Sequence, residues 1–182
     1  MAQSALLVID VQNSFLHRPF WTESDVPVFQ TALLRLIDGC QRQGVAVADI
    51  FHVSQGPFSL ESGHVVRQSF LTHRPDIQVH KHVHNALTES GLLTWLQQQE
   101  IRHLIISGIR TEQCCETTAR VASDLGYRVT FVTEATLTFP MTHDGLTLSS
   151  GELKHRTETV LIDRFAAIRS VDACLAELEQ TS

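Results

Sequence analysis

The segment HLIISGIRTEQCCETTARVASDLG, residues 103–126, decides the predicted fold. Residues 104–109 are mostly apolar and do not alternate with polar ones, which is typical of a parallel strand covered by helices on both faces. Thr111 suits a helix N-cap, and apolar or small residues then recur at helical spacing from Cys114 until Gly126. We therefore expect a strand, a turn and a helix, the unit that places reactive groups at the mouth of an α/β sheet.

Cys114 falls in the first turn of this expected helix. Backbone N–H groups point outward from that turn, and the helix dipole favours an anion there by roughly 0.3 to 1 kcal/mol. The position of Cys114 is therefore suited to a thiolate.

Length and composition favour one globular domain spanning residues 1–182, because the chain is 43% hydrophobic and long enough to bury a core. The net charge of -6, with no basic run, argues against a nucleic-acid surface. The longest apolar runs have the length of strands, and no basic segment leads an apolar one, so neither a membrane span nor a secretory signal is predicted. The four cysteines show neither metal-type spacing nor a disulfide framework, which favours a reducing cytoplasm.

Strands and helices alternate along the rest of the chain. This order predicts an α/β fold, a three-layer α/β/α sandwich around a parallel, Rossmann-like sheet of about six strands. Residues 53–74 are expected to be irregular with a short helix near 64–69, residues 137–147 a loop, and residues 150–161 a helix unless β-branching makes 157–162 a strand. Strands are predicted at 5–11, 45–52, 77–81, 104–109, 128–133 and 166–170, and further helices at 29–43, 88–99 and 171–178.

Three reactive side chains follow strands of this predicted sheet. Asp10 ends the first strand, Lys81 ends the third, and Cys114 follows the fourth, so all three can meet at one edge. The carboxylate can accept the thiol proton, the ammonium can keep the carboxylate ionised, and the sulfur can attack an electrophilic carbon. An ion pair at about 4 Å is worth roughly 4 kcal/mol at an effective dielectric near 20, more than the helix dipole contributes. Taken singly, such residues are more often a cap or loop hydrogen-bonder, a solvated lysine or a core cysteine than catalytic groups.

Several segments resemble the isochorismatase-like hydrolase superfamily, which includes nicotinamidases and N-carbamoylsarcosine amidohydrolases. The turn pattern Gly-Ile-x-Thr-x-x-Cys after a strand is the most specific of them, and the likeness covers nearly the whole chain. The matching segments are LLVIDVQNSF at 6–15, the lysine of VHKHVHNAL at 79–87, SGIRTEQCCETTARVASDLGYRV at 107–129 and RFAAIRS at 164–170.

The resemblance implies a role for each residue of the motif. It implies Asp10 as general base, Lys81 as its ammonium partner and Cys114 as nucleophile, with no cofactor and a homo-oligomer, a dimer or larger. It also implies a non-proline cis peptide between Ile109 and Arg110, and an oxyanion hole from the backbone N–H groups of Arg110 and Cys114. Cys115 stands where relatives have a small apolar residue, and we expect its side chain to point into the core.

Histidines raise the question of a metal ion. Nicotinamidases of the superfamily bind a divalent ion through an Asp-x-His pair after the second strand, but here Asp49 and His52 are three residues apart and would lie on opposite faces of a strand. We therefore predict no metal site of that type. His80, His82 and His84 alternate and would share one side of an extended segment, away from Lys81, which makes them a weaker candidate for a surface metal site.

Aromatic residues after the first strand are the tentative substrate pocket. Phe15, Phe20 and Trp21 are candidates for an apolar wall, and packing against the first helix is the alternative. His52 ends the second strand near the expected site, where either a pocket role or a structural hydrogen bond would suit it.

The predicted function is a cysteine-dependent hydrolase that cleaves a carbon–nitrogen bond in a small amide-like substrate through a thioester. One alternative is vinyl-ether hydrolysis of the isochorismatase kind, which uses the aspartate as an acid and needs no thiol. Another is a binding or redox-responsive module without catalysis, in which Cys114 and Cys115 oxidise. A disulfide between neighbouring helix residues would be strained, and that reading leaves Lys81 and Asp10 unexplained.

Overall fold

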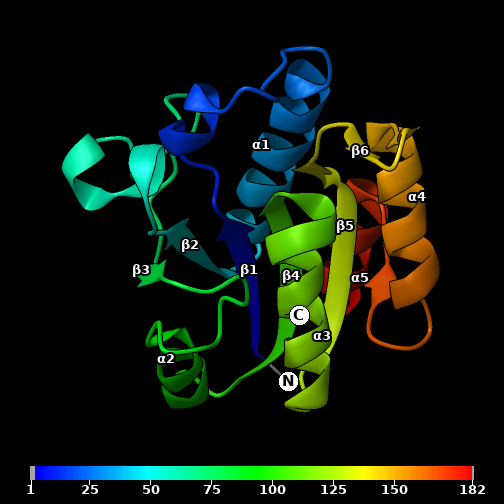
Figure 1. Cartoon of the computed structure of the whole chain (residues 1–182). Coiled ribbons are helices and arrows are strands. Elements are labelled where there is room, and N and C mark those ends of the chain that lie inside the picture. The colour runs from blue at the N-terminus through cyan, green and yellow to red at the C-terminus, as the bar shows by residue number, and fades with distance from the viewer. Residues whose placement is uncertain (1–2, 182) are drawn as a thin grey trace.

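A six-stranded parallel sheet forms the centre of the computed structural model, which describes residues 3–181 (Figure 1). The order β3-β2-β1-β4-β5-β8 is that of a Rossmann-type doubly wound sheet. The fold class predicted from the sequence is confirmed. The strands of this sheet are β1 (Gln3–Ile9), β2 (Ala46–His52), β3 (Ile77–Lys81), β4 (Ile101–Ile109), β5 (Arg128–Leu137) and β8 (Ala167–Ile168).

Helices cover both faces of the sheet, and β1 shows why. Leu6 and Val8 of β1 belong to a buried cluster with α1 (Val26–Arg42) and α5 (Val171–Thr181). The alternate residues, Ala5, Leu7 and Ile9, pack with α2 (Leu92–Gln98), α3 (Glu116–Asp124) and the end of α4 (Ser150–Leu161). Because successive strand side chains point to opposite faces, one apolar strand supplies two cores, with α3 in front of the sheet and α5 behind it in Figure 1.

Two local predictions need correction, and one open alternative is decided. Residues 137–147 are not simply a loop, because β6 (Met141–His143) and β7 (Leu146–Leu148) form an antiparallel hairpin. The short helix expected near 64–69 is absent, and within residues 53–76 the 3₁₀ turns η2 (Gly56–Phe58) and η3 (Leu60–Ser62) lie earlier. The ambiguous segment forms helix α4, because Ser149 and Glu152 make a capping box that outweighs the β-branched residues at its end.

The turn after β4 differs most from an ordinary strand-to-helix connection. Gly108 has φ of 123°, and a Cβ atom there would lie 2.0 Å from the carbonyl oxygen of Ile9, so only glycine fits. The peptide bond between Ile109 and Arg110 is cis, at the position that the resemblance implies. The next segment, η4 (Thr111–Cys115), is a π-helical turn that leads into α3.

Thr111 is not the side-chain cap that the sequence suggests. Its hydroxyl pairs with the hydroxyl of Thr136 on β5 at 2.7 Å, so it ties the turn to the neighbouring strand instead of to the helix.

Among the described residues, no helix is both long enough and apolar enough to cross a membrane.

Candidate active site

The switch point of the sheet lies between β1 and β4. Connections from these adjacent strands run in opposite directions, which opens a crevice at their carboxyl ends. Asp10 follows β1 directly with φ of 55°, and Cys114 lies in the π-helical turn after β4. Both side chains reach this crevice, with residue exposures of 1% for Asp10 and 7% for Cys114.

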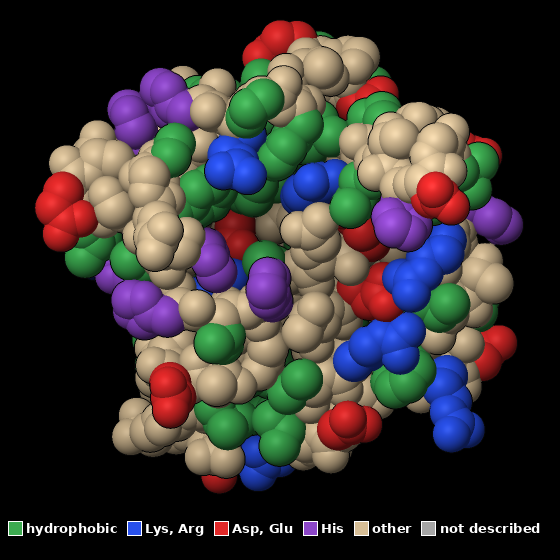
Figure 2. Space-filling view, in the orientation of Figure 1, with side chains coloured by type: hydrophobic (Ala, Val, Ile, Leu, Met, Phe, Trp, Pro, Cys, Tyr) green, Lys and Arg blue, Asp and Glu red, His purple; other side chains and the backbone are tan. Residues whose placement is uncertain are grey.

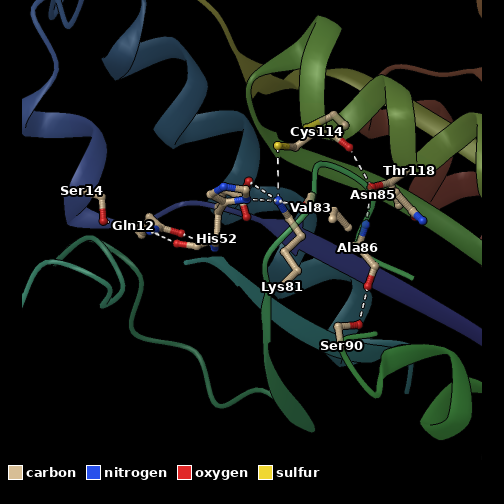
Figure 3. A network of polar contacts seen from close by, with 12 residues as sticks. Gln12, Ser14, His52, Lys81, Val83, Asn85, Ala86, Ser90, Cys114 and Thr118 are labelled. Atoms are coloured by element: carbon tan, nitrogen blue, oxygen red, sulfur yellow. Dashed lines mark hydrogen bonds and ion pairs between the residues drawn. The ribbon is translucent and has the colours of Figure 1, made fainter. Parts of the chain in front are cut away.

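Lys81 joins these two side chains from the edge strand β3 (Figure 3). Its side chain is fully buried, so the ammonium must find its partners within the protein. The structure therefore brings together all three residues of the predicted triad. The ammonium Nζ has four polar neighbours: Asp10 Oδ2 at 2.9 Å, His52 Nδ1 at 2.9 Å, the carbonyl oxygen of Val83 at 3.1 Å and Cys114 Sγ at 3.3 Å.

Burial and charge set the protonation of this cluster. Burial alone would lower the pKa of Lys81, but Asp10 and Cys114 beside it raise that pKa overall, so the ammonium stays charged. Burial raises the pKa of Asp10, and Lys81 only partly opposes this, so the carboxylate is a stronger base than an exposed one. Burial also raises the pKa of Cys114, with a further contribution from Asp10.

The expectation of a thiolate at Cys114 is therefore wrong for the resting site. Lys81 lowers the pKa of Cys114, but burial of the sulfur and the neighbouring Asp10 carboxylate raise that pKa by more. The resting arrangement is a neutral thiol next to an Asp10–Lys81 ion pair, from which the proton can pass to Asp10.

His52 has its tautomer imposed by Lys81. The ammonium can only donate, so Nδ1 of His52 must accept and the ring proton lies on Nε2. Burial, followed by the charge of Lys81, lowers the pKa of His52 to about 4, so the ring is neutral at pH 7. His52 lines the cavity, and so the structural hydrogen bond and the pocket position considered from the sequence are both present.

Two polar residues that sequence reasoning missed hold the cluster in place (Figure 3). Gln12 clamps the backbone of His52, accepting from its N–H at 2.8 Å and donating to its carbonyl at 3.0 Å. Thr118 donates to the carbonyl of Cys114 at 2.7 Å and accepts from the N–H of Ala86 at 3.0 Å, which links the cysteine turn to the segment after Lys81. Neither role had a signal in the sequence, since each depends on pairing between distant segments.

A cavity of about 330 Å³ opens above the cluster. Figure 2 shows this face hollowed, with acidic, basic and histidine side chains around the hollow. Its volume is at the small end of the range for ligand pockets, which suits a small substrate. The lining residues are Asp10, Phe15, Arg18, Phe20, His52, Ser54, Gln55, Phe58, His84, Arg110, Gln113 and Cys114.

The predicted pocket wall is correct in two of its three aromatic residues. Phe15 and Phe20 line the cavity, and Phe58 joins them from the 3₁₀ turn η2 with its ring edge-on to Phe15 at 5.0 Å. Trp21 does not line it. Its ring packs against Phe139 at 5.2 Å and its indole N–H donates to an exposed glutamate, so it belongs to the packing around α1.

A group of potential metal ligands coincides with the triad. Asp10, His52 and Cys114 place ligand atoms within 4.8 Å of one another, and theirs is the one such group of three among residues 3–181. The ammonium of Lys81 lies in contact with all three, so a metal cation there would meet a fixed positive charge. These residues do not fit a metal ion while Lys81 is charged.

The other histidine candidates are dispersed. Asp49 pairs with His73 and Arg67 on the face of β2 opposite to His52, so Asp49 and His52 do not face a common ligand. His80 packs beside Phe51, whereas His84 lies beyond the end of β3, stacks on His52 at 6.1 Å and lines the cavity. The expected alignment of His80, His82 and His84 along one side is wrong, because the strand ends at Lys81.

The two neighbouring cysteines point in different directions. Cys114 lines the cavity, while Cys115 is fully buried and its thiol points to the carbonyl of Ser107 at 3.7 Å. The core position expected for Cys115 is confirmed. The carbonyl of Arg110 accepts from the N–H groups of Gln113 and Cys115, and among the described turn and cap hydrogen bonds none uses the N–H of Arg110 or of Cys114.

Comparison with known proteins shows which family this chain matches. The family model for the isochorismatase domain matches residues 4–161. Nicotinamidase 3 of Arabidopsis thaliana is 31% identical over 153 residues, covering 75% of this chain and 74% of that protein, and the isochorismatase family protein YrdC of Bacillus subtilis is 24% identical over 98% of both chains. Among solved structures, a candidate isochorismatase from Burkholderia xenovorans has a TM-score of 0.90 and 27% identity, covering 100% of this chain and 89% of that one.

Proposed function

Because this chain belongs to the isochorismatase family of hydrolases, we propose that it hydrolyses a carbon–nitrogen bond in a small amide-like substrate, with Cys114 as the nucleophile. One observation carries the proposal: a single buried ammonium, that of Lys81, contacts both the Asp10 carboxylate and the Cys114 thiol beneath a small cavity. A buried acid, cation and thiol together in a pocket form the set that nucleophilic catalysis requires.

In the first half of the cycle, Asp10 accepts the proton of Cys114 as the sulfur attacks the substrate carbonyl. The raised pKa of Asp10 makes it a better base for this step, and Lys81 compensates the negative charge that develops on the sulfur. Asp10 then returns the proton to the leaving nitrogen, the C–N bond breaks, and an acyl thioester on Cys114 remains.

In the second half, water replaces the amine. Asp10 removes a proton from the water, which attacks the thioester carbonyl, and the acid product leaves as Cys114 recovers its proton. Both tetrahedral intermediates carry an oxyanion, for which we propose the backbone N–H groups of Arg110 and Cys114 as donors. The cycle uses only residues of this chain and water.

Vinyl-ether hydrolysis is the second candidate. The raised pKa of Asp10 would also suit an acid that protonates a vinyl carbon, and in that chemistry the thiol is idle. The contact between Lys81 and the sulfur at 3.3 Å favours the amidase, because only the amidase uses that contact. Disulfide formation between Cys114 and Cys115 is disfavoured by the opposite directions of their side chains.

A screen of primary amides and ureido acids for ammonia release tests the proposal. We expect release by the parent protein on at least one compound and none above background by Cys114→Ala. Cys115→Ala is the matched control, since it removes the same thiol one residue away without touching the cavity. Equal turnover of an amide by the parent and by Cys114→Ala would refute the nucleophile, and turnover of a vinyl ether by both would favour the alternative.

A further inference from the structure

Two arginines line the cavity, and their side chains have no role in the proposed bond cleavage. Arg18 comes from the loop after η1 (Asn13–His17), and Arg110 from the turn after β4. Both guanidinium groups lie near one aromatic ring, that of Phe20, with Cζ at 5.5 Å from its centroid for Arg18 and 4.7 Å for Arg110. Phe20 therefore holds two positive charges at the same wall.

Arg110 is buried, and only part of its hydrogen-bonding capacity is used. Its side chain is 8% exposed. Nε donates to the Thr138 hydroxyl at 3.3 Å and Nη2 donates to the Phe139 carbonyl at 3.0 Å. A guanidinium has five N–H donors in a fixed plane, so those that remain have no protein acceptor among the described residues. Buried donors of a charged group are expected to be paired, which points to a ligand.

The acid closest to Arg110 does not occupy the cavity. Glu112 Oε1 lies 3.3 Å from Nε of Arg110, on the hydrogen-bonded side of the guanidinium, and Glu112 is not a lining residue. Arg18 is exposed and has no ion pair within residues 3–181. The lining residues at Phe20 thus include two guanidinium groups and no carboxylate, and Glu112 offsets part of the charge of Arg110 from outside the cavity.

The charges elsewhere in the cavity do not balance this wall. Asp10 is the one acid among the lining residues, and Lys81 already pairs with it. Burial lowers the pKa of Arg110, Glu112 opposes this, and repulsion by the charge of Arg18 lowers it further. An anion between them would remove that repulsion and satisfy the free donors.

We propose that Arg18 and Arg110 bind a carboxylate of the substrate, so that the compound cleaved at Cys114 is a small amide or ureido acid. This inference rests on the proposed function and adds the substrate class to it. The planar fork of a guanidinium matches the two oxygens of a carboxylate, which favours this anion. The cavity of about 330 Å³ leaves room for only a short link between the carboxylate and the amide.

Matched pairs of small compounds test the charge without requiring turnover. Malonamate, succinamate and glutaramate each carry one amide and one carboxylate, and the diamides malonamide, succinamide and glutaramide replace the carboxylate with a neutral group of the same shape. Binding of each to Cys114→Ala protein is measured by calorimetry, so that hydrolysis cannot disturb the result. We expect at least one acid to bind about tenfold or more tightly than its diamide, the size expected for a charged contact.

Arginine variants in the same background locate the effect. Arg18→Gln and Arg110→Gln should each reduce the preference for the acid several-fold. High salt should also reduce this preference in the Cys114→Ala protein that keeps both arginines. Arg164→Gln, which removes an exposed arginine far along the chain, is the matched control and should keep the preference. If Arg110→Gln does not fold, Arg18→Gln decides, since its side chain is exposed.

The outcomes separate the substrate class from the chemistry. Equal binding of acids and diamides, no binding by any acid, or a preference untouched by both arginine variants would overturn the carboxylate site. Ammonia release by the parent on these same compounds reports on the proposed function independently. A preference for acids without ammonia release would support the carboxylate site and refute the amidase. Equal release from diamides and acids would support the amidase and refute the carboxylate site.

Discussion

Two buried aspartates, one after β1 and one on the neighbouring strand β2, form ion pairs, but their surroundings differ. Asp10 pairs with Lys81 below a cavity, beside a thiol and a neutral histidine. Asp49, on the other face of β2, pairs with His73 at 2.8 Å and with Arg67 at 3.5 Å, and no thiol lies beside it. Arg67 and His73 also join each other, through a hydrogen bond of 2.6 Å from the guanidinium to the carbonyl.

The difference shows that a buried charge pair is not by itself an active site. In the Asp49 cluster the partners come from the 53–76 loop, so the ion pairs fasten that loop to the sheet. In the Asp10 cluster the partners come from strand ends and a helix start, which are rigid, and the free side of the cluster faces a cavity. We therefore expect changes in the Asp49 cluster to affect stability alone, and changes in the Asp10 cluster to affect turnover as well.

The largest effect expected is that of Cys114→Ala on turnover. Without a nucleophile the rate should fall about 10⁴-fold or more, because residual catalysis comes only from binding and the oxyanion donors. Stability should change little, and Cys115→Ala should show the opposite pattern, with turnover retained and a small loss of packing energy. Steady-state kinetics and denaturant unfolding measure both, and a Cys115→Ala protein as inactive as Cys114→Ala would contradict the assignment of Cys114 as the nucleophile.

Lys81→Met should affect both quantities. Removing the ammonium leaves Asp10 buried without its partner, which costs about 3 to 5 kcal/mol of unfolding free energy and lowers turnover by about 10²-fold or more. The double variant Lys81→Met/Asp10→Asn should recover most of the stability and none of the turnover, since it removes both charges. Recovery of turnover in the double variant would mean that the ion pair serves only the fold.

Asp49→Asn should have a smaller effect and on stability alone. The amide keeps the shape but loses the charge, so the unfolding free energy should fall by about 1 to 3 kcal/mol while kcat stays near that of the parent. His73→Gln should resemble it if the loop is fastened by this pair. A loss of kcat comparable with that of Lys81→Met would show that the Asp49 cluster takes part in catalysis.

Acid should weaken the Asp10 cluster through His52. The pKa of His52 is lowered to about 4 from about 6.5, so between these values the unfolded chain binds a proton that the folded protein does not. Stability is unaffected by His52 above pH 6.5 and declines as the pH falls from about 6.5 to about 4. Urea unfolding at several pH values should show this slope in the parent and a shallower one in His52→Gln, and identical slopes would argue against a neutral His52.

The positions of the strand ends were predictable because the carboxyl ends of parallel strands all lie at one edge of a sheet. Apolar runs located β1 and β4, and the short segment 77–81 was recognised as β3, so the residues at their carboxyl ends had to meet at one edge, as Asp10, Lys81 and Cys114 do. The protonation of Cys114 was not predictable, because the depth of burial depends on how the π-helical turn packs.

The residues that sequence reasoning missed or misplaced depend on contacts between distant segments. Trp21 packs on Phe139, which lies in a different part of the chain, and nothing near Trp21 indicates that partner. Arg110 was assigned a backbone role, but its side chain also enters the cavity because Phe20, Thr138 and the Phe139 carbonyl direct it there. Pairing of this kind becomes visible only when the fold is known.

The glycine at position 108 sets a limit on the natural variation of this enzyme. Gly44 and Gly126 also have positive φ, but they face open space, so asparagine or aspartate can replace them at modest cost. At Gly108 the nearest atom is backbone, which cannot move aside as a side chain can. A saturation library should therefore tolerate substitution at Gly44 and Gly126 and none at Gly108. A lineage that evolves towards a new substrate has to change other residues of the site and keep this glycine.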